Sequence, residues 1–148
     1  MIREGKKLPA DVLEHLPTLI QKVAEDPDVA ALYAFGSLAQ GALKPLSDLD
    51  FGVLLREGLE KPERFRKSLA LLGLFNETLK TDEIDLVILD DAPLRFAHHI
   101  LKTGKRLHCR DPQRVIDFVE RTTKRYLDFK PARDEFDRGF LEGIGCHG

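Results

Sequence analysis

Short apolar runs of strand length alternate with helical segments along this chain, and this alternation defines its fold class. Strands are predicted at 29–35, 48–55 and 84–89, with a fourth, edge strand at 107–109. Helices are predicted at 8–25, at 62–79, at 93–103 and from Asp111–Pro112 onward, where the pair is typical of an N-cap followed by a first helical residue. We therefore expect an α+β fold, with a small mixed β-sheet flanked by helices.

The apolar spacing of the two longest helices predicts which of their faces are buried. In the helix after Pro62 the predicted inward residues are Phe65, Leu69, Leu72, Phe75 and Leu79. In the helix after Pro112 they are Val115, Phe118, Val119, Thr122 and Tyr126. The segment from about residue 130 is charged and glycine-rich, so we expect one domain over 1–148, with a core at about 8–129 and a flexible tail at about 130–148.

Charge, cysteine content and hydropathy exclude several classes of protein. The formal net charge of −2 disfavours a protein that coats nucleic acid, so no direct nucleic-acid binding is expected. The two cysteines are too few for a disulfide framework, which is typical of the reducing cytosol. No stretch approaches the roughly 20 apolar residues that span a bilayer, and the first residues lack the apolar region of a signal peptide. We expect a cytoplasmic protein without a membrane partner.

The residues with the clearest chemical meaning are a Gly-Ser pair and three aspartates. Asp48 and Asp50 are two residues apart on a predicted strand, so both carboxylates project from one face and can hold a hard divalent cation. Asp85 interrupts the apolar run of the next strand, where an ionised carboxylate is costly unless a metal or partner compensates it. Gly36 and Ser37 follow the first strand, at a turn into a helix where backbone amides can approach a phosphate. Together they predict a phosphate and metal site.

Four segments and a single aspartate carry a resemblance to a known family. The runs 34–41 (AFGSLAQG), 47–54 (SDLDFGVL) and 84–93 (IDLVILDDAP), together with 100–107 and Asp111, resemble the minimal nucleotidyltransferase (MNT) branch of the DNA polymerase β-like superfamily. Similar single-domain proteins are antitoxins beside HEPN-domain RNase toxins, in type VII toxin–antitoxin pairs. Such antitoxins resemble adenylyltransferases that transfer AMP from ATP to a tyrosine of the toxin. The resemblance therefore implies a HEPN-domain toxin as partner in a hetero-oligomer.

The resemblance also implies a role for each matching residue. Asp48 and Asp50 would be ligands of Mg²⁺, and Asp85 would be the third carboxylate, as a metal ligand or as the general base. Gly36 and Ser37 would cradle the phosphates of ATP. The chain has nothing resembling the extra helical domain of larger aminoglycoside nucleotidyltransferases, which favours a protein as the acceptor.

Two other functions stay open at the level of sequence. The chain is also consistent with a transferase that modifies a small molecule such as an aminoglycoside, and with a non-catalytic antitoxin that acts by binding alone. The basic residues Arg95, Lys102, Lys105 and Arg106 fit either a contact with a triphosphate or a solvated basic face. Ser37 lacks a recognisable neighbouring base, so a serine hydrolase is disfavoured.

Overall fold

The computed structural model describes residues 11–41 and 48–143, and the side chains of these residues up to 128. It contains a four-stranded sheet built from β1 (Val29–Phe35), β2 (Leu49–Leu55), β3 (Ile84–Ile88) and β4 (Lys105–Cys109). The strand order is β3-β2-β1-β4. β1 pairs antiparallel with β2 and with β4, whereas β2 and β3 are parallel. The predicted mixed sheet is confirmed, and β4 lies at an edge as expected.

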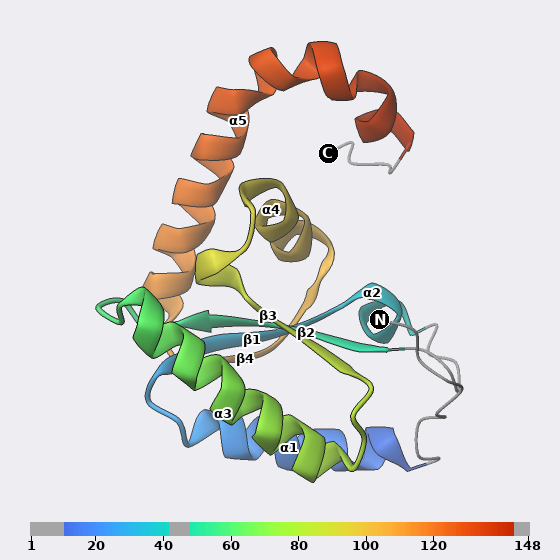
Figure 1. The fold of residues 1–148 in the computed structure, drawn as a ribbon, viewed down its shortest axis with the longest axis vertical. Coiled ribbons are helices and arrows are strands. Elements are labelled where there is room, and N and C mark those ends of the chain that lie inside the picture. Colours follow the sequence, from blue (N-terminus) through green and yellow to red (C-terminus); the bar gives the residue numbers. More distant parts are fainter. Residues whose placement is uncertain (1–10, 42–47, 144–148) are drawn as a thin grey trace.

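Helices cover both faces of this sheet (Figure 1). One face carries the 3-10 turn η1 (Val12–His15) with α1 (Leu16–Ala24) and α3 (Lys61–Leu79), and the other carries α4 (Leu94–Thr103) and α5 (Pro112–Gly143). The short α2 (Gly36–Gln40) follows β1, and η2 (Leu89–Asp91) follows β3. The predicted element order and the α+β class are confirmed.

The alternation of side chains along the strands divides the core into two clusters. Leu32, Phe51 and Val53 face α1 and α3, where Phe51 meets Phe75 edge to face with ring centroids 5.0 Å apart. On the opposite face Tyr33 and Phe35 pack with residues of α4 and α5. The α5 residues predicted to face inward do so: Val115, Phe118, Thr122 and Tyr126 are buried and Val119 is half-buried. Burial of apolar area on both faces is the main stabilising force of such a fold.

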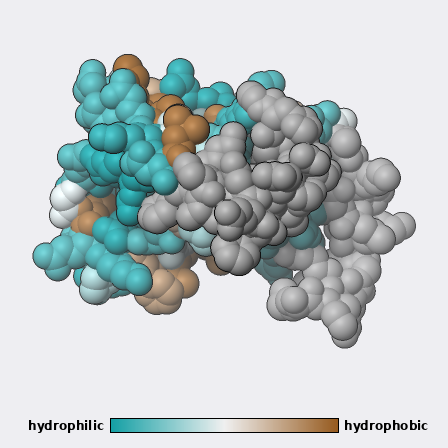
Figure 2. Space-filling model, turned by 90° about the horizontal axis from the view of Figure 1, so that it is seen from above, coloured by the Kyte–Doolittle hydropathy of each residue, from teal (hydrophilic) through white to brown (hydrophobic). Residues whose placement is uncertain are grey.

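Few apolar side chains remain on the described surface. Seen from above, they form separate patches among hydrophilic residues (Figure 2). The exposed large apolar residues are Leu13, Phe65, Leu69, Phe96, Ile116 and Leu127. Phe65 and Leu69 correct the sequence prediction for α3, because they are 63% and 55% exposed instead of buried. The buried face of α3 consists of Leu71, Phe75, Thr78 and Leu79.

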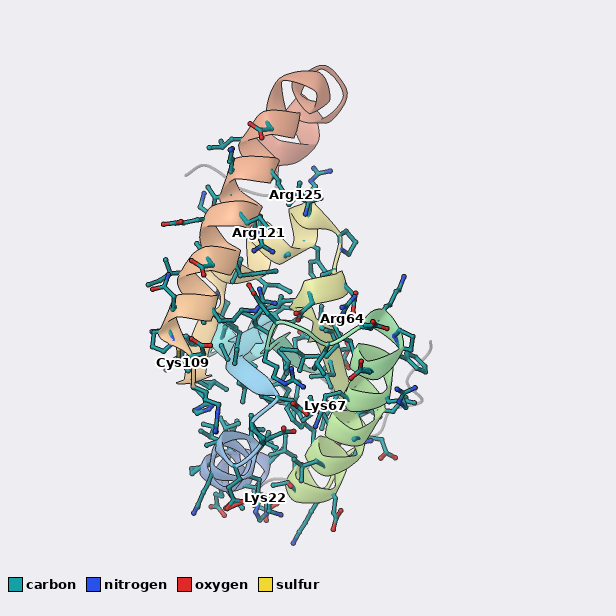
Figure 3. The ribbon with its side chains drawn as sticks, turned by 90° about the vertical axis from the view of Figure 1, so that its left-hand side faces the viewer. Lys22, Arg64, Lys67, Cys109, Arg121 and Arg125 are labelled. Carbon is teal, nitrogen blue, oxygen red and sulfur yellow. The ribbon has the colours of Figure 1, made fainter. Side chains whose placement is uncertain are left out.

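Ion pairs on α3 explain why Phe65 turns outward. Arg64 donates hydrogen bonds to Asp91 of η2, the shortest at 2.7 Å. Lys67 bonds to Asp26 and Asp28 of the turn between α1 and β1, each at 3.0 Å. Both basic side chains, labelled in Figure 3, therefore fix one side of the helix toward the rest of the molecule. Partial burial lowers the pKa of Lys67, but its hydrogen bonds to the two aspartates outweigh this effect and raise the pKa.

The start of α5 is joined to η2 by a buried ion pair and to the end of β2 by a hydrogen bond. Arg114 donates from Nε to the carbonyl of Leu55 at 3.0 Å and from its guanidinium to Oδ2 of Asp90 at 2.8 Å. Oδ1 of Asp90 accepts the backbone N–H of Leu55 at 3.0 Å. Burial raises the pKa of Asp90, although this N–H and the Arg114 charge act in the opposite direction. Asp111 caps α5 by accepting the N–H of Arg114, so the predicted N-cap is confirmed.

The helix assignment of α5 runs on to Gly143, beyond residue 130, where the sequence predicts the start of a flexible tail. The flexibility of that tail and the single-domain organisation stay predictions. Residues 8–10 of the first predicted helix, the predicted loop at 44–47 and residues 144–148 of the tail lie outside the described part of the chain.

Candidate active site

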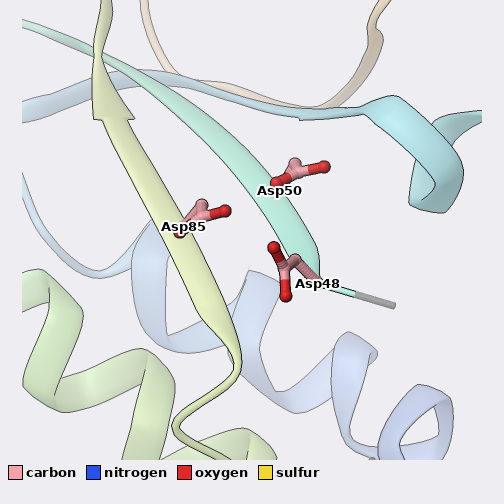
Figure 4. Close-up of side chains that lie close together, drawn as sticks. All are labelled: Asp48, Asp50 and Asp85. Carbon is pink, nitrogen blue, oxygen red and sulfur yellow. The ribbon is translucent and has the colours of Figure 1, made fainter. Parts of the chain in front are cut away.

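The parallel pairing of β2 and β3 brings the three predicted aspartates together. Asp50 lies opposite Asp85 in the register of the two strands, so both side chains leave the same face of the sheet. The N–H of Leu49 donates to the carbonyl of Glu83 at 2.9 Å and fixes Asp48 beside this pair. One carboxylate oxygen from each of the three aspartates lies within 4.8 Å of the other two (Figure 4).

The burial of these carboxylates differs from the sequence argument. Asp48 and Asp50 are half-buried, but Asp85 is exposed because β3 is an edge strand. An energetic penalty for burying Asp85 therefore does not indicate a metal, and that part of the sequence reasoning is wrong. Proximity is the stronger argument: three carboxylates at this spacing repel one another, and a cation bound between them would remove that repulsion.

The cluster fits a hard divalent cation. Its donor atoms are all carboxylate oxygens, which Mg²⁺ and similar ions prefer. Metal–oxygen distances of about 2.1–2.5 Å place opposite ligands about 4–5 Å apart, which matches the spacing of the three oxygens. The half-exposed position leaves room for further ligands from water or a substrate phosphate. We searched the described residues for groups of three or more histidine, cysteine or acidic side chains that could hold a metal, and these three aspartates form such a group.

Gly36 lies beside this cluster for a reason that the sequence did not reveal. The register of β1 and β2 pairs Phe35 with Asp50, so the next residue approaches the Asp50 side chain. Gly36 has φ of +62°, and a Cβ there would overlap Oδ2 of Asp50. Glycine is favoured here both by its backbone conformation and by the space that the carboxylate fills. Ser37 follows in the first turn of α2, half-buried, at the predicted turn from strand to helix.

The four basic residues noted in the sequence lie on α4 and β4, and not on the strands that carry the aspartates. Lys105 and Arg106 lie on β4, which is two strands away from β2 and pairs with β1. Lys102 is exposed near the end of α4. Arg106 lies against Tyr33, whose pKa is raised by burial and lowered to a smaller extent by this arginine. A contact of the four basic residues with a triphosphate stays a prediction.

The fold and the site together define the class of protein: an α+β nucleotidyltransferase fold with an acidic cluster on two adjacent strands. The family model described as Polymerase beta, Nucleotidyltransferase matches residues 18–113, which is well over half of the chain. The chain belongs to this family. Among curated proteins, none matches the sequence at a significant level.

Solved structures with the same fold come from toxin–antitoxin systems. A toxin–antitoxin structure with AMP-PNP superposes with a TM-score of 0.60 at 22% identity, over 88% of this chain and 96% of the other. The MntA–HepT toxin–antitoxin gives a TM-score of 0.56 at 20% identity, over 90% and 96%. A tri-AMPylated Shewanella oneidensis HEPN toxin in complex with MNT antitoxin gives 0.54 at 21% identity, over 90% and 95%. At these identities the likeness shows the fold.

Across the described helices, none is both long enough and apolar enough to cross a membrane.

Proposed function

We propose that this chain is a Mg²⁺-dependent protein adenylyltransferase that acts as the antitoxin of a HEPN-type RNase toxin. The observation that carries the proposal is the convergence of Asp48, Asp50 and Asp85 within 4.8 Å on a nucleotidyltransferase fold. The donor would be ATP and the acceptor a tyrosine of the toxin, in the cytoplasm. Structures of the same fold that contain AMP-PNP or a tri-AMPylated HEPN toxin support these finer choices.

Each residue of the site then has a task in the transfer. Asp48, Asp50 and Asp85 would hold Mg²⁺, which supplies charge to the triphosphate and lowers the pKa of the acceptor hydroxyl. Gly36 and Ser37 would donate their amides and hydroxyl to the terminal phosphates. The exposed position of Asp85 leaves it accessible to an incoming hydroxyl, so it would also accept the proton of that hydroxyl. The acceptor oxygen bonds to the α-phosphorus, the bond from that phosphorus to the bridging oxygen breaks, and pyrophosphate leaves.

A tyrosine acceptor agrees with the chemistry of the open site. The phenol has a pKa near 10, so a carboxylate or metal removes its proton more readily than that of a serine hydroxyl. The part of the chain that the structure describes places no helical lid over Asp85, which is exposed. A flexible segment of a partner protein therefore has access to the cluster.

The partner would contact α5, within residues 111–129. Ile116 and Leu127 are 48% and 55% exposed on this helix, and half-buried Thr123 lies between them. The three positions recur at helical spacing and form one outward stripe, which suits packing against a helix of another protein. Deletion of this helix would remove part of the core as well, so single substitutions on the stripe are the better test.

Intact mass spectrometry of the toxin tests the proposed activity. After incubation with this chain, ATP and Mg²⁺, the toxin should gain AMP units, and the gain should vanish with Asp48→Asn, with Asp85→Asn or without the toxin tyrosine. Asp11→Asn is the matched control, because Asp11 is an exposed aspartate outside the cluster. Neutralisation of the toxin without any mass change would instead support a non-catalytic antitoxin. If an aminoglycoside is modified and the toxin is not, the assignment as a nucleotidyltransferase stands and the assignment as an antitoxin is overturned.

A further inference from the structure

The outer edge of β3 is a strand edge with free pairing capacity in the described structure. β3 is the terminal strand of the sheet and pairs only with β2 among the described residues. The carbonyl of Glu83 accepts from Leu49 of β2, so residues of the same parity, 83, 85 and 87, direct their backbone groups toward β2. Ile84, Leu86 and Ile88 therefore direct their N–H and C=O groups away from the sheet. Proteins usually protect such an edge with charge, proline or a bulge.

Exposed apolar side chains border this edge on the side of α3. Phe65 and Leu69 are 63% and 55% exposed on the helix that packs against β3. A groove of about 370 Å³ separates α3 from the strand, and its lining includes the apolar Phe65, Leu86 and Ile88 and the charged Lys61, Arg64 and Asp91. The charged residue of β3, Asp85, leaves the opposite face of the sheet. An added strand would therefore place its side chains beside Phe65, Leu86 and Ile88 of this groove.

We propose that a second copy of this chain pairs with β3 in antiparallel orientation, about a two-fold axis at Leu86, to form a continuous sheet of two subunits. Two-fold pairing requires a self-complementary surface, and β3 meets this requirement. Leu86 lies opposite Leu86 of the partner subunit, and Ile84 lies opposite Ile88 of the partner subunit. These residues carry the outward backbone groups, so each opposing pair is of the hydrogen-bonded type.

Charge and packing favour the same arrangement. Asp85 lies opposite Val87 of the partner subunit, so no two aspartates are directly opposed on the face of the active site. On the other face, the partner's strand enters the space beside the groove and covers Phe65, which lies in the groove together with Ile88. The same contact occurs twice by symmetry. A second copy supplies this match from β3 itself.

Sedimentation velocity of the full chain, over a range of concentrations, measures the association directly. We expect a dimer, and a loss of self-association of at least tenfold in the double variant Phe65→Glu plus Leu69→Glu. Both side chains are mostly exposed, so the fold should tolerate the change. Ile116→Glu is the matched control, since it places the same charge on an exposed apolar position of α5 and should leave the dimer intact. A monomer at all concentrations, or a dimer unaffected by the double variant, overturns the proposal.

A cysteine cross-link tests the register of the pairing. In a background with Cys109→Ser and Cys146→Ser, Leu86→Cys should form a disulfide with its own copy on mild oxidation, because hydrogen-bonded antiparallel partners have Cα atoms about 5.5 Å apart. Val87→Cys should not, because it lies opposite Asp85 of the partner subunit. Equal cross-linking of both variants, or of neither, contradicts the register. β3 also carries Asp85 of the active site, but sedimentation and cross-linking measure association and not nucleotidyl transfer, so these results do not depend on the proposed activity.

Discussion

Replacing Gly36 with alanine tests whether the approach of β1 to Asp50 shapes the acidic cluster. Two costs follow from the structure. An alanine at φ of +62° lies in the left-handed region, which costs about 1–2 kcal/mol, partly offset by about 0.4–1 kcal/mol from the lower entropy of the unfolded chain. In addition, the new Cβ would overlap Oδ2 of Asp50, so this carboxylate must move to another rotamer at a cost of roughly 1 kcal/mol. We expect a total loss of about 1–3 kcal/mol in the free energy of unfolding.

Gly41→Ala is the matched control for the backbone cost. Gly41 also has a positive φ, of 68°, but no described atom lies within 4 Å of a Cβ built there. Both variants should therefore lose a similar amount of stability from their backbone conformation, measured by urea denaturation. Only Gly36→Ala should also weaken Mg²⁺ binding in titration calorimetry, by about tenfold or more, because one of three carboxylates has moved. Mg²⁺ affinity unchanged in Gly36→Ala, or reduced equally in both variants, would refute the reasoning.

Two further predictions concern ion pairs outside the cluster. Arg114→Met should lower the free energy of unfolding by about 3 kcal/mol, because it leaves the Asp90 side chain, which is 10% exposed, without its cation. In chemical denaturation, the double variant Arg114→Met plus Asp90→Asn should recover part of the lost free energy of unfolding. An Arg114→Met variant as stable as the parent would contradict a stabilising role of this ion pair. The Arg64 hydrogen bonds lower the pKa of Asp91 below 3.8, so the Asp91 contribution to stability is present above about pH 4 and is lost as the pH falls through the lowered pKa. Asp91→Asn should therefore flatten the acid side of the stability curve, whereas parallel curves for the variant and the parent would count against this pair.

Much of the fold was predictable because strand and helix periods are local properties. The runs at 29–35, 84–88 and 94–103 show their period within a few residues, and each element lies where it was expected. The pairing of Asp50 with Asp85 was predictable only as proximity of neighbouring strands. The family pattern supplied the expectation that the three aspartates share one site, and the register of β2 and β3 gives the geometric reason.

The parts that escaped prediction depend on contacts between distant residues. Phe65 and Leu69 fit a helical stripe, but Arg64 and Lys67 bind partners on other elements and turn these two outward. The exposure of Asp85 follows from the edge position of β3, which no feature within that strand encodes. Likewise, the link from Arg114 to Asp90 joins residues 24 positions apart. Gly36 was assigned to phosphate approach, and its proximity to Asp50 requires the pairing of β1 with β2.

The register that pairs Phe35 with Asp50 bears on how relatives of this chain should be recognised. Both ends of the connection between β1 and β2 are fixed by the sheet, so residues inserted into the connection need not displace either end. Lengthening such a connection costs little, about 0.6 kcal/mol for each doubling. The number of residues between Ser37 and Asp48, ten in this chain, is therefore free to vary. The two-residue step from Asp48 to Asp50 is not, because a single insertion there would turn one carboxylate to the opposite face of the sheet. A search pattern for this family should allow a variable gap in the first interval and none in the second.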